Sequence, residues 1–343
     1  MLQALAPRVT IKGVAVLSGL SICTVSRALR NLPNVSANAQ AKVSDAAAKL
    51  GYKASPAAAR LAGGSTGSVA IIAPTATAWF FGHAVEAAEE VLAGAGYGTV
   101  LISLRNRPSV HRKLFGDLAG LSQRVDGVLL LNIALSEAEV AALAGSGLAV
   151  ASVGMHDVPW DNVGIDDVQA ARAATEHLLG LGHWDLAMLA GSETGEPSLI
   201  TANERLRGFG QALEAHHLTI DPDLVLEAGP SIEGGRLAMI ELIENRRMPS
   251  AILAGTDETA FGALMALRDL GLSAPKNVSI IGMDDHQMSW FLGLSTISQP
   301  VADQGAFAAN LLIDRLHRPG LPNPPSSHLL ETKLIERKST RRR

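Results

Sequence analysis

The stretch VTIKGVAVLSGLSICTVSRALRNLPNVSANAQAKVSDAAAKLGY, residues 9–52, decides the fold of the N-terminal part of the chain. Thr10 is placed to cap a first helix, Ser21 a second and Ser36 a third, longer one. Apolar residues follow each cap at helical spacing, and Gly19 is placed to end the first helix. Two short helices joined by a glycine turn and supported by a third predict a helix-turn-helix unit.

The second helix of such a unit enters the major groove of DNA, led by its N-terminal residues. Its face away from the core carries Ile22, Cys23, Ser26 and Arg27. Arginine can pair with guanine through two hydrogen bonds, and isoleucine can pack on a thymine methyl group. Cys23 has a second interpretation as a redox sensor, but a small packed or groove-facing side chain is favoured. Ser21, Thr24 and Ser36 carry hydroxyls suited to phosphate contacts, and Thr10 and Asn34 complete the set of candidate DNA-binding residues in this stretch.

Charge divides unevenly along the chain. The 343 residues carry a net charge of −4, but residues 1–65 carry +7 and the remainder −11. A compact basic segment on an acidic body indicates a module that binds a polyanion. The alternative is a solvated basic tail without a partner.

The composition predicts a soluble protein with enough apolar residues to form hydrophobic cores. Hydrophobic residues make up 47% and charged residues 18%, and the length suggests two or three folding units. The single cysteine allows no disulfide within the chain, which fits a reducing compartment. We see no signal-peptide pattern and no apolar run near the roughly 18 residues that a membrane span needs. We therefore expect a cytoplasmic protein, nucleoid-associated when bound to its operator, with no membrane partner.

Residues 9–64 resemble the DNA-binding region of the lactose-repressor/galactose-repressor family of transcription regulators. The resemblance runs in order and without gaps. The matching residues are Val9–Lys12, Val14–Ala15, Thr24–Arg27, Val35–Ser36 and Leu50–Tyr52.

Several positions depart from the family pattern. Gly13 stands where the family usually has an acid, Arg30 replaces a common asparagine, and Ala54 replaces a common proline. Ile22 and Cys23 occupy the positions at which the family varies its base reading. The resemblance therefore implies an operator preference of this chain's own.

Residues 55–65, SPAAARLAGGS, form a short segment with a helix-starting Pro56 and a closing glycine pair. A helix this short is marginal in water. The resemblance implies that it folds when two copies meet over the operator. Leu61 then matches the family's minor-groove wedge, and Ala58 the small residue beside it. Taken without the family, the same residues indicate a flexible linker.

From Ser68 onward, β-branched runs alternate with helical stretches in two series. Alternating β and α predicts an α/β body of two lobes with parallel sheets, and ligands of such sheets bind at the carboxyl ends of the strands. The cleft between the lobes is thus the expected site. The expected boundaries are a helix-turn-helix domain at 8–54, a hinge at 55–65 and an effector-binding domain at 66–337, with lobe one at about 66–160 plus 295–325 and lobe two at about 164–290.

The body resembles the same family and, through it, the periplasmic sugar-binding proteins, in which two lobes close over a ligand. The resemblance covers nearly the whole chain. Its landmarks are Leu181–His183, Arg205–Phe209, Asp257–Leu264, Val278–Asp285 and Leu294–Pro300.

By position in that resemblance, Arg205 and Asp284 match the family's principal effector-binding residues. A guanidinium and a carboxylate suit the hydroxyls of a small polar ligand. Asp284 in an ion pair at a strand end is the alternative. Phe80 and Phe81 are expected either to wall the pocket or to belong to the core.

Two further effector positions depart from the family. Thr256 stands where the family often has asparagine, and Ser231 where it often has an aromatic residue that stacks on the ligand. The resemblance makes a sugar or sugar derivative the expected effector, and the departures suggest that it differs from a simple pyranose.

Enzyme motifs are absent from the sequence. There is no phosphate-binding loop of the G-x-x-x-x-G-K-[ST] type and no H-E-x-x-H pattern. Asp257, Asp284 and Asp285 are a metal-binding alternative, which sugar-binding carboxylates explain better. We expect no enzyme activity, no cofactor and no metal. Two competing classes remain, a free-standing sugar-binding protein for transport and an enzyme on a related scaffold.

The sequence thus predicts a repressor that binds a pseudo-palindromic DNA operator as a homodimer, or as an assembly of dimers, and responds to a small carbohydrate effector. A dimer is the simpler expectation, since no long leucine heptad is seen near the C-terminus. Whether the effector induces or corepresses stays open.

Overall fold

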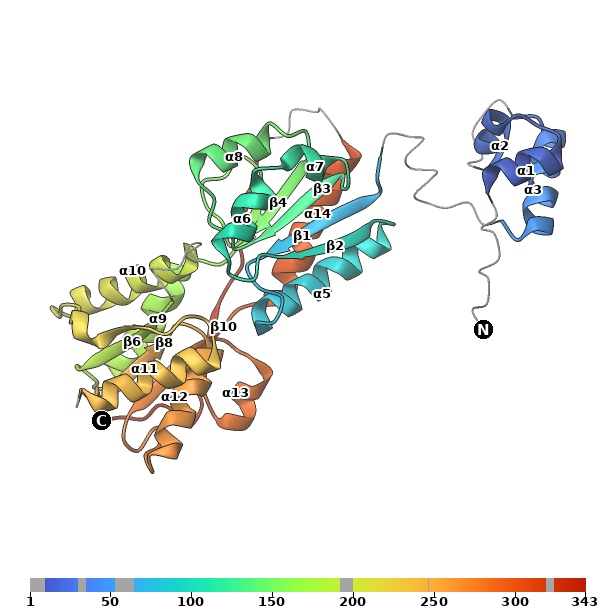
Figure 1. Ribbon diagram of the computed structural model, residues 1–343. Coiled ribbons are helices and arrows are strands. Elements are labelled where there is room, and N and C mark those ends of the chain that lie inside the picture. Colours follow the sequence, from blue (N-terminus) through green and yellow to red (C-terminus); the bar gives the residue numbers. More distant parts are fainter. Residues whose placement is uncertain (1–9, 30–34, 53–64, 192–199, 246, 319–323) are drawn as a thin grey trace. The chain divides into compact units, whose positions relative to one another are not determined.

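The computed structural model describes residues 10–29, 35–52, 65–191, 200–245, 247–318 and 324–343 (Figure 1). The chain divides into two compact units, residues 1–67 and residues 68–343, each of which is described by itself.

The described residues of the first unit form three helices: α1 (Ile11–Ser18), α2 (Ile22–Leu29) and α3 (Ala37–Leu50). The Ser21 hydroxyl accepts a hydrogen bond from the Thr24 amide at 3.1 Å and so caps α2. The axes of α1 and α2 are bent by 106° at the turn between them. This is the predicted helix-turn-helix arrangement.

Small apolar side chains join the three helices. One buried face of each helix contributes to a single cluster, and the Gln40 side chain donates from α3 to the Ala28 carbonyl at 2.8 Å. The buried members of the cluster are Val14, Ala15, Val25, Ala28, Val43 and Ala46. A core of alanine and valine lets the helix backbones approach closely, so the unit stays compact with few aromatic residues.

The first lobe of the second unit is built on a six-stranded parallel sheet with strand order β11-β5-β4-β3-β1-β2. Its strands are β1 (Ser68–Ala73), β2 (Gly98–Ser103), β3 (Gly127–Leu131), β4 (Ala149–Val153), β5 (Asp161–Gly164) and β11 (Ser327–Leu329). Its helices are α5 (Trp79–Gly94), α6 (Pro108–Phe115), α7 (Leu118–Ser122), α8 (Glu137–Ala144) and α14 (Val301–His317).

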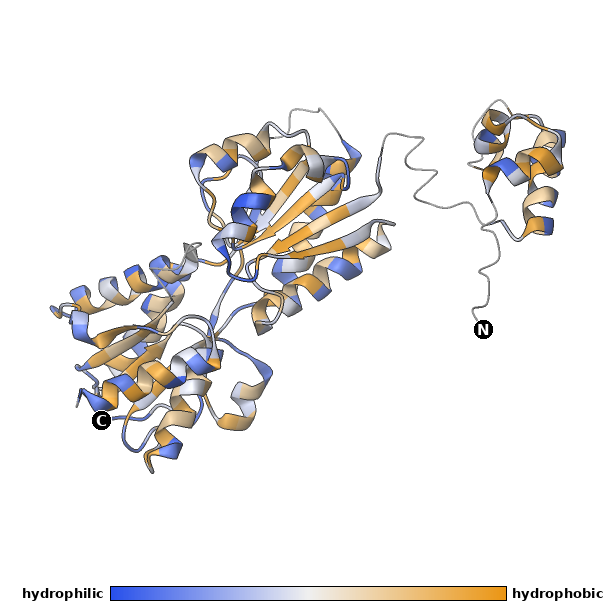
Figure 2. Cartoon of the chain, viewed as in Figure 1, coloured by the Kyte–Doolittle hydropathy of each residue, from blue (hydrophilic) through white to orange (hydrophobic). Residues whose placement is uncertain are grey.

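Alternation along β1 shows how this sheet buries both faces. Val69 and Ile71 pack with α5 and α14, whereas Ala70 and Ile72 pack with α6, α7 and α8. Figure 2 shows the apolar strands between helices that carry hydrophilic residues on their outer sides. A strand covered on both faces has a continuous apolar sequence, and this is the pattern of SVAIIA.

The second lobe repeats the plan with the order β12-β10-β9-β8-β6-β7, parallel except for the β10–β12 pair. Its strands are β6 (Leu186–Ala190), β7 (Val225–Glu227), β8 (Ala251–Ala254), β9 (Ser279–Asp284), β10 (Ser295–Ser298) and β12 (Lys333–Ile335). Its helices are α9 (Asp167–Gly180), α10 (Ile200–Ala215), α11 (Ile232–Glu244), α12 (Asp257–Asp269), α13 (Gln287–Leu292) and the 3-10 turn η1 (Pro222–Leu224).

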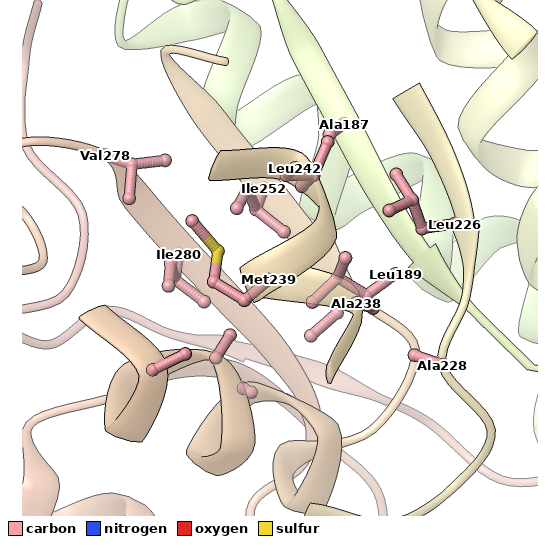
Figure 3. Packing of buried hydrophobic residues seen from close by; sticks show 14 of the residues in the cluster. Ala187, Leu189, Leu226, Ala228, Ala238, Met239, Leu242, Ile252, Val278 and Ile280 are labelled. Carbon is pink, nitrogen blue, oxygen red and sulfur yellow. The ribbon is translucent and has the colours of Figure 1, made fainter. Parts of the chain in front are cut away.

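Met239 and Leu242 of α11 lie over the second sheet, against Ile252 and Ile280 (Figure 3). On the opposite face, α9 and α10 bury a separate cluster that includes Phe209. Burying both faces makes each lobe a rigid support for the loops at its strand ends.

Three chain crossings join the lobes, and here the structure differs from the expected boundaries. The strand at Val163 belongs to the first sheet, and β10, expected in lobe one, belongs to the second. β10 extends the second sheet because it pairs in parallel with β9 through residues 295–298. The C-terminal segment then supplies one strand to each sheet, β11 beside β5 and β12 beside β10. A strand that follows a short connection can join either sheet. The sequence pattern of β10 alone therefore did not show to which lobe it belongs.

No single helix among the described residues is long and apolar enough to cross a membrane. Of the described helices, only α1 and α2 taken together reach the length and apolar composition of a membrane span. They form a bent pair that packs against α3.

Candidate functional site

The N-terminal half of α2 presents its predicted DNA-binding residues to solvent. Ile22 and Cys23 are exposed, whereas Thr24, Ser26 and Arg27 are half-buried. Val25 and Ala28 on the opposite face are buried in the three-helix core. An exposed isoleucine at the start of a helix costs solvation free energy in the free protein, and a groove contact would recover it.

The other described DNA-binding candidates lie at helix starts. Thr10 is exposed at the start of α1, where its side chain makes no capping hydrogen bond. Ser36 caps α3 by accepting from the Ala39 amide at 3.3 Å. Asn34, Ala58 and Leu61 lie outside the described residues.

A cavity lies between the two lobes of the second unit, and we call it the interlobe cavity. Its empty space is about 540 Å³, including the solvent at its mouth. Lobe one contributes two phenylalanines and amide side chains, while lobe two contributes every charged group among the described lining residues. The residues that line it are Ala78, Phe80, Phe81, Asn132, Gly154, Ile165, Asp167, Thr201, Arg205, Pro230, Thr256, Glu258, Asp284, Gln299 and Gln304.

Arg205 on α10 is the buried guanidinium of this cavity. Its Nε donates to Asp167 Oδ1 at 2.7 Å, and its Nη1 donates to the Gly255 carbonyl at 2.5 Å. Burial lowers the Arg205 pKa, but the nearby carboxylates, Asp167 first, outweigh this and raise it above its ordinary value. The guanidinium is therefore charged, held in one orientation, and anchored to α9 and to the loop after β8.

Asp284, at the end of β9, is the second buried group. Gln299 Nε2 donates to its Oδ1 at 2.6 Å, and Gln304 Nε2 donates to Gln299 Oε1 at 2.9 Å. Asp284 and Asp285 both have positive φ, 124° and 57°. Two consecutive residues in a sparsely populated region mark a strained turn, which sets the direction of the Asp284 side chain.

Burial governs the electrostatics of the cavity. It raises the pKa of the Asp284 carboxyl to about 7, against the opposing charge of Arg205 and with the help of Asp257. Burial also raises the pKa of Asp167, despite its ion pair with Arg205, and of Glu258. The three carboxyls among the described lining residues therefore bind protons more tightly than exposed carboxyls do, until a ligand supplies donors.

Asp257, which is fully buried at the start of α12, does not line the cavity but holds together the elements around it. It accepts hydrogen bonds from Ser289 Oγ at 2.6 Å and Thr296 Oγ1 at 2.7 Å, and from the His286 amide at 2.9 Å. Burial raises its pKa to about 6. It thereby ties α12 to α13 and β10.

The metal alternative for Asp257, Asp284 and Asp285 has no support. Asp285 faces away into an ion pair with Arg337 at 2.6 Å, so the three carboxylates are engaged with three different partners. No group of three metal-ligating side chains is found among the residues described.

The mouth of the cavity is bridged by Trp79 at the start of α5. Its backbone amide donates to Glu258 Oε2 at 3.2 Å, and its indole Nε1 donates to Gln287 Oε1 at 2.5 Å. Its ring lies 5.0 Å from that of His286, measured between centroids. An aromatic residue of lobe one therefore rests on lobe two.

Two polar contacts join the lobes on the other side. Asn132 Nδ2, after β3, donates to Thr201 Oγ1 of α10 at 3.0 Å. His156 Nε2 lies 3.0 Å from Glu204 Oε2. These contacts define a closed arrangement of the lobes, with the cavity enclosed between them.

Five of the six predicted effector residues come together here. Phe80, Phe81, Arg205, Thr256 and Asp284 all line the cavity, and Phe81 is also buried in the core of lobe one. Ser231 is not among the lining residues.

The exception is explained by helix capping. The Ser231 hydroxyl caps α11 by accepting from the Gly234 amide at 3.1 Å, and Pro230 beside it lines the cavity instead. Arg205 forms its ion pair with Asp167, a residue that the sequence reasoning did not single out.

Several lining residues escaped the sequence reasoning. Asn132 directly follows the apolar strand β3, and a polar residue after an apolar run was the signal that could have found it. Asp167 and Gln299 follow β5 and β10, whose sequences DNVG and STIS give no such signal. Thr201 and Gln304 lie within helices and carry no such signal.

Comparisons with known proteins agree with this architecture. Residues 10–55 match the family model described as bacterial regulatory proteins, lacI family, and residues 175–340 match a periplasmic binding protein-like domain. The HTH-type transcriptional regulator DegA of Bacillus subtilis is 32% identical over 87% of this chain and 89% of its own length.

Solved structures extend the likeness to the whole fold. The Lac repressor dimer bound to operator and an anti-inducer is 25% identical and covers 98% of this chain and 100% of its own, with a TM-score of 0.81. The complex of the transcriptional regulator CelR with cellobiose is 29% identical and covers 97% and 100%, with a TM-score of 0.71.

A helix-turn-helix unit followed by a two-lobed body with an enclosed polar cavity defines a ligand-responsive DNA-binding transcription regulator rather than an enzyme. The chain belongs to the lacI family of bacterial regulatory proteins. The predicted family and fold class are thereby confirmed.

Proposed function

We propose that this regulator is a repressor that binds a pseudo-palindromic operator as a homodimer and responds to a sugar or sugar derivative in the interlobe cavity. The observation that carries the proposal is the pairing of an exposed recognition face on α2 with an enclosed, polar cavity in the body. The named relatives support it, since one was solved on its operator and another with cellobiose.

On the DNA side, α2 enters the major groove, with Arg27 pairing with guanine and Ile22 and Cys23 setting the base preference. The hinge of residues 55–65 orders over the centre of the site, where Leu61 wedges into the minor groove beside Ala58. Two-fold symmetry of the dimer then requires two symmetric half-sites.

On the effector side, Arg205 and Asp284 hold the ligand hydroxyls, and Phe80 and Phe81 cover an apolar face of the ring. Thr256 supplies a further hydroxyl. Ligand binding shifts the equilibrium between lobe arrangements, and this shift changes the spacing of the two hinges and hence the affinity for the operator.

The test is selection of sites from random DNA duplexes by the full-length protein, read by fluorescence anisotropy at two salt concentrations. We expect a palindromic site to be enriched and a sugar to change its affinity. Arg27→Ala should weaken binding to that site by about 10- to 100-fold, because a bidentate contact is worth about 1–3 kcal/mol. Non-specific, salt-dependent binding should persist.

Lys49→Ala is the matched control, since it removes the same charge from the exposed side of α3, where Lys49 pairs with Asp45. Its operator affinity should change little. Equal losses in the two variants would reduce α2 to a non-specific basic surface, and the absence of any enriched site would reject the operator-binding proposal.

A further inference from the structure

The charges around the interlobe cavity are strongly unequal. Among the described lining residues, Asp167, Glu258 and Asp284 face a single cation, Arg205. Asp167 already pairs with Arg205 at 2.7 Å. Asp284 lies within the field of Arg205 but forms no ion pair among the described residues, and neither does Glu258.

Helix dipoles do not make up the difference. The N-termini of α9 and α12 point toward the cavity, and each is equivalent to roughly half a positive charge. Asp166 and Asp167 at the start of α9, and Asp257 and Glu258 at the start of α12, exceed that charge. At these two helix starts, acidic side chains therefore outnumber the positive charge of the helix N-termini.

The open hydrogen-bonding groups of the described lining include buried acceptors. Asn132 Nδ2 is engaged with Thr201, but its Oδ1 is buried and has no partner among the described residues. Asp284 accepts a hydrogen bond from Gln299 on Oδ1. A buried acceptor left unpaired costs about 1–3 kcal/mol, so the cavity is built to receive donors.

The donor groups of the cavity are largely engaged with the protein. Arg205 donates Nε and Nη1 to Asp167 and Gly255, and the amides of Gln299 and Gln304 donate within their own chain of hydrogen bonds. A phosphate or carboxylate would meet the carboxyl groups of Glu258 and Asp284 as well as the N–H groups that Arg205 and the glutamine amides keep open. Bringing an anion beside buried carboxylates costs free energy by charge repulsion.

Resting on the proposed effector function, we propose that the ligand is a polyol that carries a protonated amine, such as an amino sugar, and that the cavity rejects phosphorylated and carboxylated sugars. The ammonium group lies between Glu258 and Asp284. The hydroxyls donate to Asn132 Oδ1, and the ring lies against Phe80 and Phe81 of lobe one.

The proton balance follows from the same arrangement. Burial holds the pKa of Asp284 at about 7, so at pH 6.5 most of the free protein carries a proton there. An ammonium placed beside the carboxyl favours its ionised form, and the proton is released to the buffer. Binding enthalpy should therefore depend on the ionisation enthalpy of the buffer.

The experiment is isothermal titration calorimetry of the full-length protein at pH 6.5 with matched sets of hexoses and pentoses. Each set contains the neutral sugar, the amino sugar, the N-acetylated amino sugar, the 6-phosphate or 5-phosphate, and the uronic acid. We expect an amino sugar to bind at least about tenfold more tightly than its neutral and N-acetylated counterparts, because charge-assisted hydrogen bonds are about twice as strong as neutral ones. The anionic members should not bind.

Two variants separate charge from shape. Glu258→Gln and Asp284→Asn keep the size of the side chain and should each reduce the preference for the amino over the neutral sugar by about tenfold. If the two carboxyl groups had only a structural role, their replacement would weaken the binding of the amino sugar and of the neutral sugar by the same factor. Glu89→Gln, on the exposed side of α5, is the control and should leave the preference unchanged.

The inference is overturned if an anionic sugar binds more tightly than its neutral parent, or if no amine-bearing member binds. Should a neutral sugar bind and change operator affinity while the amino sugar does not, the proposed function stands and only this inference fails. If no sugar of any charge class binds while operator binding still depends on Arg27, the sugar part of the proposed function fails with it.

Discussion

At the scale of single residues, Asp284 combines a strained backbone with a buried carboxyl group. Its φ of 124° lies beyond the left-handed helical region that asparagine and aspartate enter, in a range that residues with a side chain rarely adopt, and its side chain is held by Gln299. Strain and a raised pKa at one position are typical of sites where structure has been shaped by ligand binding rather than by stability.

This carboxyl predicts how stability depends on pH. Its pKa is about 7 in the folded protein against an ordinary value of 3.8, so the folded state holds a proton that the unfolded chain has lost. The free energy of unfolding should therefore fall as the pH rises from about 4 to about 7. Asp284→Asn should flatten this slope by up to about 1.4 kcal/mol per pH unit.

Urea unfolding at several pH values, followed by tryptophan fluorescence, measures this slope. The four tryptophans all lie in residues 68–343, so the signal follows the body of the protein. Asp157→Asn is the control, since Asp157 is exposed and asparagine accepts its positive φ of 53°. An unchanged slope in Asp284→Asn would show that this carboxyl is ionised in the folded protein.

At the scale of elements, the sequence predicted where helices and strands form better than it predicted which lobe each strand joins. Caps such as Ser21 and Ser36 and the apolar run of β1 act locally, and local signals survive in a single sequence. The lobe of β10 depends on pairing with β9, a contact that no periodicity encodes.

The site was predicted to a similar degree. Arg205 and Asp284 were found through family resemblance, and their place in the cavity agrees with it. Thr201 and Gln304 were missed because a polar residue on a helix looks solvated until the opposite lobe is placed against it. Ser231 was misplaced because helix capping and ligand binding call for the same residue type.

Helix α13 carries a prediction about assembly. Within six residues it exposes Met288, Trp290, Phe291 and Leu292, with Trp290 at 74% and Phe291 at 76%. Clustered apolar side chains of this size mark an interaction surface, and a second copy of the chain is the partner that the proposed dimer requires.

Replacing Phe291 with aspartate should therefore weaken the dimer at least about tenfold, because a charge would have to be buried in an apolar interface. Sedimentation velocity at a series of protein concentrations measures the dissociation constant. Leu101→Asp, at an exposed position on β2 of the first lobe, is the control. A dimer that survives Phe291→Asp with unchanged affinity would place the interface elsewhere.

At the scale of the whole body, the two lobes are held together by few contacts outside the three chain crossings. Trp79, Asn132 and His156 each reach from lobe one to a polar residue of lobe two. A closed state held by such contacts differs from an open one by only a few kcal/mol, the range in which a ligand can shift the equilibrium.

Trp79 makes the largest of these contacts, so its removal should favour the open arrangement even without a ligand. Trp79→Ala deletes the indole hydrogen bond to Gln287 and the ring contact with His286. Fluorescence energy transfer between labels at Glu89 on α5 and Glu214 on α10, placed in a Cys23→Ser background, should then report a longer distance. Trp184→Ala removes a half-exposed tryptophan within lobe two and should leave the distance unchanged. Identical transfer in all three proteins would mean that the chain crossings alone hold the lobes closed, and effector binding would then have to act on the regulator by a route other than closure.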